Sequence, residues 1–183
     1  MLVSHAPSQR HAGYTVIELL VTVAIIAIAM MIAVPSFIEF RRGAALSSAA
    51  SNLAAALNNA RSEAMARGTR TRVVPAGPSW ASGVVSFVDL DGSGNPSEQN
   101  ITLSEQPAVP GFLSISGPAV FQFEPSGFAS VLSGTLSLKR SDVSEADELR
   151  QTRSIDVART GRIRVCTPTS APDPLCPVAD DPN

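Results

Sequence analysis

Residues 13–40 read GYTVIELLVTVAIIAIAMMIAVPSFIEF, a long apolar stretch with one carboxylate, Glu18, near its start. The residues from Leu19 to Ile38 carry no charge. A helix of about 20 apolar residues spans roughly 30 Å, the thickness of the hydrocarbon core of a bilayer. A secretory signal peptide fits less well, because its apolar core is shorter and a small-residue cleavage site follows it. We therefore expect residues 14–38 to form a membrane-spanning helix.

Glu18 is unusual in such a segment. A carboxylate at the centre of a membrane helix costs on the order of 2.5 to 3.5 kcal/mol, and acids in such places usually have a partner. One interpretation places Glu18 in the headgroup layer. Another requires a cation, which cleavage of the chain before Tyr14 would create, because the new α-amino group would lie four residues from Glu18 on the same helix face.

The hexapeptide GYTVIE at residues 13–18 resembles the processing site of type IV pilins and type II secretion pseudopilins, which place glycine, an aromatic residue, threonine and glutamate at this spacing. The resemblance implies that residues 1–13 are a leader and that a prepilin peptidase cuts between Gly13 and Tyr14. It also implies that Tyr14 is then N-methylated. Glu18 would pair with a terminal amine as subunits are added to a filament.

The same resemblance implies a location and a set of partners. The protein would be a single-pass subunit of the bacterial inner membrane with its head in the periplasm, and it would later enter a pilus or pseudopilus. Its partners would be other pilins or pseudopilins, the prepilin peptidase and the inner-membrane assembly platform.

Residues 39–68 continue the helix and become amphipathic. Apolar side chains recur every three or four residues, at Leu46, Ala49, Leu53, Leu57, Ala60 and Ala64. Packing of this stripe on a sheet of the same chain is favoured over an independent coiled coil, because alanine-rich stripes make poor zippers. Gly68 directly after Arg67 is typical of a helix end.

Residues 69–183 contain most of the prolines and glycines and a series of short alternating segments. We expect strands at residues 71–74, 83–88, 101–103, 121–123, 135–138, 154–157 and 162–165. Turn residues separate these segments, which predicts an antiparallel sheet or a pair of sheets. These patterns predict an α+β fold, with a long N-terminal helix, transmembrane and then amphipathic, packed on an antiparallel β-sheet head. The resemblance of residues 13–18 implies that this fold is type IV pilin-like.

Three head motifs extend the resemblance. WASGVVSFVDLDGSG (residues 80–94), FQFEPSGFAS (residues 121–130) and TGRIRVC (residues 160–166) occur in the order found in H-type minor pseudopilins and in the FimT and FimU minor pilins. The chain resembles this GspH/FimT/FimU class over nearly its whole mature length. The resemblance implies a minor pilin or pseudopilin that initiates or caps a type IV pilus or a type II secretion pseudopilus.

Cys166 and Cys176 lie close together near the C-terminus, without a histidine nearby to indicate a metal site. A short-loop disulfide in an oxidising compartment is favoured over two free thiols. The two histidines, His5 and His11, fall in the expected leader, and residues 14–183 have neither a histidine to activate a serine nor a phosphate-binding glycine loop. We expect no enzymatic activity and no cofactor.

Residues Asp89 to Asn95, DLDGSGN, place oxygen ligands at alternate positions, as calcium loops do. The twelfth position is Asn100 rather than glutamate, and we expect strands rather than helices on either side. A tight hairpin turn is therefore favoured over a calcium site.

The net charge of -2 means that binding to nucleic acid would require a local basic patch. Residues 148–166, ELRQTRSIDVARTGRIRVC, contain Arg159, Arg162 and Arg164. In a strand over residues 162–166, Ile163 and Val165 face the core, and Arg162 and Arg164 share the opposite, solvated face.

That face has two interpretations. It is either an ordinary solvated strand surface or a contact for successive DNA phosphates, because alternate strand residues lie roughly 7 Å apart. In FimT-like minor pilins the matching G-R-x-R has been linked to DNA capture during natural transformation. The resemblance implies the same role for Arg162 and Arg164, with Arg159 nearby.

Overall fold

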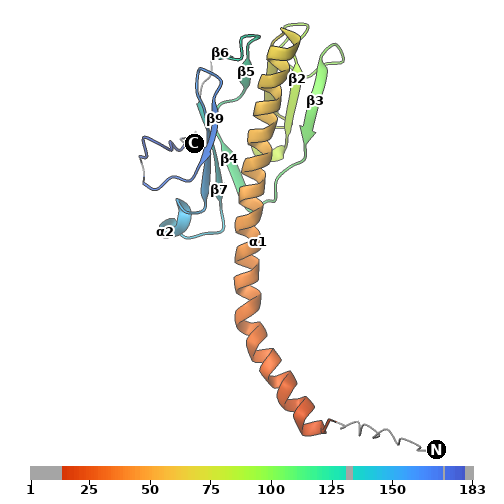
Figure 1. Ribbon diagram of the computed structural model, residues 1–183, viewed down its shortest axis with the longest axis vertical. Helices are drawn as coiled ribbons and strands as arrows, with labels where there is room; N and C mark the ends of the chain where they lie inside the picture. The colour runs from red at the N-terminus through yellow and green to blue at the C-terminus, as the bar shows by residue number, and fades with distance from the viewer. Residues whose placement is uncertain (1–13, 131–133, 171, 180–183) are drawn as a thin grey trace, which may run out of the picture. The chain divides into compact units, whose positions relative to one another are not determined.

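The computed structural model describes residues 14–130, 134–170 and 172–179. Figure 1 shows the order of the elements along the chain. They are α1 (Val16–Arg67), β1 (Thr71–Pro75), the 3-10 turn η1 (Trp80–Ser82), β2 (Val84–Val88), β3 (Ile101–Gln106), β4 (Leu113–Ser116), β5 (Phe121–Phe123), β6 (Ala129–Ser130), β7 (Gly134–Arg140), α2 (Glu145–Glu148), β8 (Thr152–Val157) and β9 (Ile163–Cys166). The chain divides into two units, with the boundary after Arg41.

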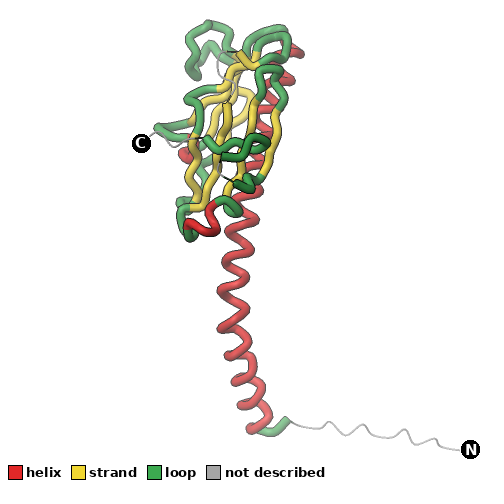
Figure 2. Tube along the Cα trace, turned by 90° about the vertical axis from the view of Figure 1, so that its left-hand side faces the viewer, coloured by secondary structure: helices red, strands yellow, loops and turns green. Residues whose placement is uncertain are grey.

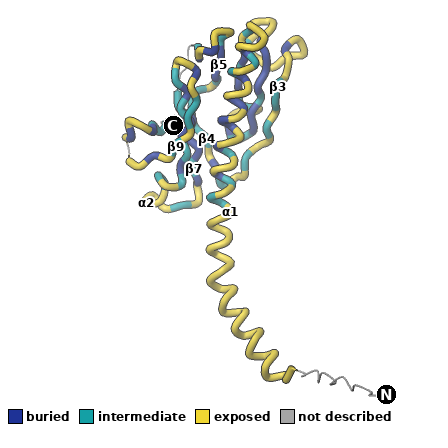
Figure 3. The backbone as a smooth tube through the Cα atoms, in the orientation of Figure 1, coloured by how far each residue is buried: buried dark blue, intermediate teal, exposed yellow. Residues whose placement is uncertain are grey.

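The described part of the first unit is helical from Val16 onward, and its side chains are exposed (Figure 3). α1 contains a stretch that is long and apolar enough to cross a membrane, and none of that stretch is buried within the chain. Apolar side chains left exposed over several turns need lipid or another protein to cover them. By length and composition, α1 is therefore a candidate membrane span.

In the second unit, α1 is half-buried along one stripe. The buried residues are Leu46, Ala50, Leu53, Ala54, Ala56, Leu57, Ala60 and Ala64. Five of the six predicted stripe residues are among them, whereas Ala49 is only partly buried and packs at the edge of the core. The buried stripe is wider than predicted, because it also includes Ala50, Ala54 and Ala56. The helix ends as predicted: Gly68 adopts a left-handed φ of 63°, and the Thr69 amide donates to the Ala64 carbonyl at 3.3 Å, which satisfies one of the last helical acceptors.

Within the described residues, the head contains two antiparallel sheets. One has five strands in the order β3-β2-β1-β5-β6, and the other has four in the order β4-β7-β8-β9. Figure 2 shows the strands beside the helix. All seven predicted strands are present, although β3 extends to Gln106. β4 and β6 were not predicted. β6 is only two residues long, too short for an alternating pattern to reveal it.

A single hydrophobic core joins the helix stripe to both sheets. Side chains of β1, β5, β7 and β8 reach it, and their fully buried members include Val73, Phe121, Phe123, Leu136, Leu138 and Ile155. Polar groups at its border are paired. The Trp80 Nε1 donates to the Pro118 carbonyl at 2.8 Å, and the Thr71 hydroxyl donates to the Ala60 carbonyl of α1 at 2.8 Å. These observations confirm the predicted fold class.

The connection between β2 and β3 is longer than the tight hairpin turn expected there. It runs from residue 89 to residue 100 and is held by its own side chains. Asp91 Oδ1 accepts hydrogen bonds from the Ser93 amide at 2.9 Å and from Asn100 Nδ2 at 3.0 Å, and its Oδ2 accepts from the Ser97 hydroxyl at 2.9 Å. The buried Asp89 carboxylate lies 2.9 Å from Arg72 Nε.

These contacts favour a structural loop over a calcium site. The carboxylate oxygens of Asp89 and Asp91 already have partners, and the described residues contain no cluster of three or more His, Cys, Asp or Glu side chains able to hold a metal ion. The hydrogen bond from the Ser93 amide, helped by the Ser93, Ser97 and Asn100 side chains, lowers the pKa of Asp91 well below its ordinary value.

We predict that the difference in unfolding free energy between the wild type and Asp91→Asn depends on pH. A carboxyl whose pKa is lowered by folding stabilises the fold above its unfolded pKa, about 3.9, and loses that contribution as the pH falls through the folded value. Asp91→Asn should therefore be less stable than the wild type near neutral pH, and the gap should shrink below about pH 3.9. Urea unfolding of both proteins across this range measures it.

Glu98→Gln is the matched control, because Glu98 is an exposed carboxylate of the same loop whose side chain makes no hydrogen bond within the described residues. It should match the wild type at every pH. A gap for Asp91→Asn that stays constant as the pH falls would contradict the role assigned to the Asp91 charge.

Candidate functional sites

The first turn of α1 forms one half of a capping box. Thr15 precedes the helix, and its hydroxyl oxygen accepts a hydrogen bond from the Glu18 amide at 3.2 Å. Its carbonyl accepts the first helical hydrogen bond, from the Leu19 amide at 3.2 Å. Threonine before a helix with glutamate three residues later is a known start signal, and a carboxylate in the first turn suits the positive end of the helix dipole.

Glu18 therefore has two roles. It lies in the capped first turn of α1, and it belongs to the expected processing motif. Its side chain is exposed, as is Tyr14. The sequence analysis did not predict that Thr15 caps the helix, although the spacing T-x-x-E is the signal for such a cap. Gly13, the expected residue before the cut, lies outside the described residues.

The two glycine motifs of the head meet beside the last turns of α1. Arg61 of α1 donates from Nε to the Gly127 carbonyl at 2.9 Å and from Nη2 to the Thr160 carbonyl at 3.3 Å. Gly161 has a left-handed φ of 77°, and a Cβ added there would lie 2.0 Å from the Gly127 carbonyl oxygen. Glycine at 161 thus permits a close backbone approach, and Arg61 ties both loops to the helix.

Arg159 and Arg162 lie on the turn that Arg61 fixes. Backbone hydrogen bonds shape this turn, from the Ala158 amide to the Arg162 carbonyl at 2.9 Å and from the Gly161 amide to the Ala158 carbonyl at 2.8 Å. Both arginine side chains are exposed. Within the described ranges, neither makes a hydrogen bond or an ion pair. They are two cationic side chains on a hydrogen-bonded turn, and both are exposed to solvent.

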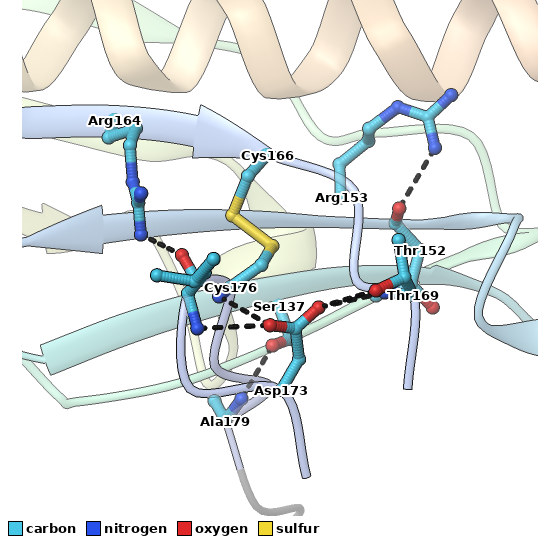
Figure 4. Close-up of a disulfide and its surroundings, with 10 residues drawn as sticks. Ser137, Thr152, Arg153, Arg164, Cys166, Thr169, Asp173, Cys176 and Ala179 are labelled. Atoms are coloured by element: carbon cyan, nitrogen blue, oxygen red, sulfur yellow. Dashed lines mark hydrogen bonds between the residues drawn. A yellow bond between two sulfur atoms is a disulfide. The ribbon is translucent and has the colours of Figure 1, made fainter. Parts of the chain in front are cut away.

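Arg164 lies in a different environment, and here the expectation of a shared solvated face does not hold. Its Nη2 donates to the Leu175 carbonyl of the C-terminal segment (Figure 4), and its side chain is only partly exposed. Val165 also differs from expectation. It pairs with the fully buried Ile155 and so shares its side of the sheet, but β9 is an edge strand and leaves Val165 41% exposed.

A disulfide joins Cys166, at the end of β9, to Cys176, with a Cα–Cα distance of 5.9 Å. Asp173 organises the loop between them. Its Oδ2 accepts from the Thr169 amide at 2.9 Å and its Oδ1 from the Leu175 amide at 2.9 Å. These backbone hydrogen bonds, that from Thr169 foremost, lower the pKa of Asp173. Closing a loop of this size with a disulfide stabilises a fold by about 3 kcal/mol.

Comparison with known proteins gives two family matches. The model of type II transport protein GspH matches residues 49–161, and that of the prokaryotic N-terminal methylation motif matches residues 8–34. No curated protein matches the chain in sequence.

Solved structures share the fold. The type IV minor pilin FimU of Pseudomonas aeruginosa is 21% identical, with a TM-score of 0.56 over 68% of this chain and 93% of that one. The minor pseudopilin EpsH from the type 2 secretion system of Vibrio cholerae is 17% identical, with a TM-score of 0.52 over 68% of this chain and 98% of that one.

The GspH match covers well over half of the chain, and the methylation motif adds the N-terminal segment that the head match lacks. The resemblance seen in the sequence is thereby confirmed. The chain belongs to the GspH family and is a minor pilin or pseudopilin, a structural subunit of the kind that builds type IV pili and type II secretion pseudopili.

Proposed function

We propose that this protein initiates or caps a type IV pilus or a type II secretion pseudopilus. The observation that carries the proposal is the contrast along α1: its first unit exposes an apolar surface headed by Glu18, whereas the stripe from Leu46 to Ala64 is buried in the head. The exposed part is suited to lipid before assembly and to other pilins or pseudopilins afterwards. The helix then carries the head into the filament.

The proposed route begins in the inner membrane, with a single span and the head in the periplasm. A prepilin peptidase cuts between Gly13 and Tyr14, and Tyr14 is methylated. The new amine is a cation, and an unpaired Glu18 carboxylate in hydrocarbon is unfavourable. Pairing of Glu18 with the terminal amine of a subunit in the filament removes that cost, so transfer through the assembly platform is favoured over remaining in lipid.

A second candidate function, DNA capture, is favoured by one observation. Arg159 and Arg162 are exposed and have no partner within the described residues, on a turn that Arg61 and Gly161 hold in place. The guanidinium group forms paired hydrogen bonds with phosphate and stays charged at every physiological pH. Two such groups would contact a DNA backbone without reading its sequence. This role is compatible with that of a filament subunit.

We predict that Glu18→Gln prevents incorporation into the filament. The variant keeps the size and polarity of the side chain but removes the charge that pairs with the amine. Thr15→Ala is the matched control, because it removes the helix cap, worth about 1 kcal/mol, and leaves the carboxylate in place. The fraction of subunit recovered with isolated filaments, measured by immunoblotting, should fall to background for Glu18→Gln and persist for Thr15→Ala.

Because Thr15 and Glu18 both belong to the processing motif, mass spectrometry of the N-terminus should show that Glu18→Gln and Thr15→Ala are both still cut before Tyr14. Failed assembly is then not failed processing. Incorporation of Glu18→Gln at the wild-type level would show that the Glu18 charge does not drive assembly.

For DNA capture, we predict that the double variant Arg159→Ala, Arg162→Ala loses affinity for duplex DNA at low salt. Each lost phosphate contact should reduce the slope of log K against log salt by about 0.9. Arg150→Ala is the matched control: it removes one exposed arginine from the connection before β8, the opposite end of that strand from Arg159. Fluorescence anisotropy with the full chain in a nonionic detergent measures both quantities. Wild-type binding by the double variant would refute the DNA role.

A further inference from the structure

The four-stranded sheet has a polar face turned away from the core. Residues directly opposite each other on neighbouring antiparallel strands share a face, so the register defines rows across β7, β8 and β9. Two adjacent rows on this face are Ser137, Ser154 and Cys166, and then Thr135, Asp156 and Arg164. The core side chains Leu136 and Ile155 alternate with them and point the other way.

The C-terminal segment is attached to this polar face at three points (Figure 4). The disulfide joins Cys176 to Cys166, the Leu175 carbonyl accepts from Arg164 Nη2, and the Ala179 amide donates to the Ser137 hydroxyl at 2.6 Å. Ser137 is fully buried although it belongs to the face opposite the core. The segment therefore acts as a cover over these rows.

The cover leaves two polar atoms without partners. Arg164 Nε and the Ser154 hydroxyl are buried and make no hydrogen bond within the described residues. Buried polar groups of this kind oppose the closed arrangement, because water would satisfy both on opening. The disulfide is the one covalent tie among the three attachments, so its loss should shift the balance toward an open segment.

We infer that the disulfide loop is a redox-controlled cover over Arg164. A dithiol reductant supplies two electrons and two protons: the Cys166–Cys176 bond breaks, each sulfur becomes a thiol, and the reductant closes its own disulfide. The freed segment leaves Arg164 exposed two residues from Arg162. The cationic surface of Arg159 and Arg162 then gains a third guanidinium, and this functional consequence rests on the proposed DNA role.

The cover itself is tested without DNA. The full chain in nonionic detergent is treated with phenylglyoxal, which modifies accessible guanidinium groups, and the rates at Arg164 and Arg162 are read by peptide mass spectrometry. In the oxidised protein Arg164 should react several-fold more slowly than Arg162. After reduction with dithiothreitol, and in Cys166→Ser, Cys176→Ser, the two rates should converge, whereas equal Arg164 rates before and after reduction would overturn the inference.

Fluorescence of Trp80, the single tryptophan, checks that the core survives reduction, because Trp80 is buried against Phe121. Unchanged emission with a faster Arg164 reaction supports a local cover. A shift of Trp80 emission to that of an unfolded chain would overturn the inference, because the loop would then hold the fold together and not simply cover one residue.

Titration of duplex DNA tests the consequence separately. Reduction should steepen the slope of log K against log salt by about 0.9, the value for one added phosphate contact. Arg164→Ala should abolish this increment and leave the slope of the oxidised protein unchanged. If neither redox form binds DNA, the DNA role is refuted, whereas the phenylglyoxal rates still test whether the disulfide loop covers Arg164. If Arg164 becomes reactive and the slope does not change, its contribution to DNA binding is refuted.

Discussion

The burial of the small-residue stripe of α1 is the contact on which the rest of the head depends. Alanine at positions such as Ala50, Ala60 and Ala64 leaves almost no side chain between the helix and the strands, so the backbones approach closely. That approach lets the Thr71 hydroxyl reach the Ala60 carbonyl. It also brings Arg61, the residue after Ala60, within hydrogen-bonding distance of the carbonyls of Gly127 and Thr160, which lie far along the chain. The helix thus organises both sheets and the arginine-bearing turn.

The same helix serves a different purpose in each unit. Where small and apolar residues form one stripe, the chain covers them itself, whereas up to Arg41 the apolar side chains point in all directions and stay exposed. A single head can bury only one face of a helix, so a helix that is apolar all round needs lipid or other subunits. The hydrogen bond from the Glu18 amide to the Thr15 hydroxyl caps the exposed end of the helix, within the segment that the methylation-motif model matches.

Periodic features were predictable from the sequence, and contacts between distant segments were not. The helix stripe and most strands follow from spacing alone, as does the Gly68 helix end. Alternation also assigned Val165 correctly to the side of Ile155, but it carries no information on which strand lies at the edge, and there the predicted burial fails. β4 was missed because LSIS is short and half polar.

At the candidate site too, contacts between distant segments could not be predicted from the sequence, as the arginines show. Arg162 and Arg164 look equivalent in the sequence, yet only the return of the C-terminal segment, with the Leu175 carbonyl, distinguishes them. The clamp from Arg61 to Gly127 likewise joins residues 66 positions apart, which no local pattern reveals. Sequence alone did identify the family motif and the cysteine pair, and it indicated where the basic residues lie along the chain.

The unfolding free energy of two alanine-to-leucine variants of α1 tests the central contact most directly. Ala60 is fully buried in the stripe, and Ala55 is exposed on the same helix, so the two variants add the same atoms with the same effect on helix propensity. Ala60→Leu should destabilise the head by about 1 to 3 kcal/mol or more, because the added atoms have no space. Ala55→Leu should stay within about 0.5 kcal/mol of the wild type. Equal stability of the two variants would contradict the close packing of α1 against the sheets.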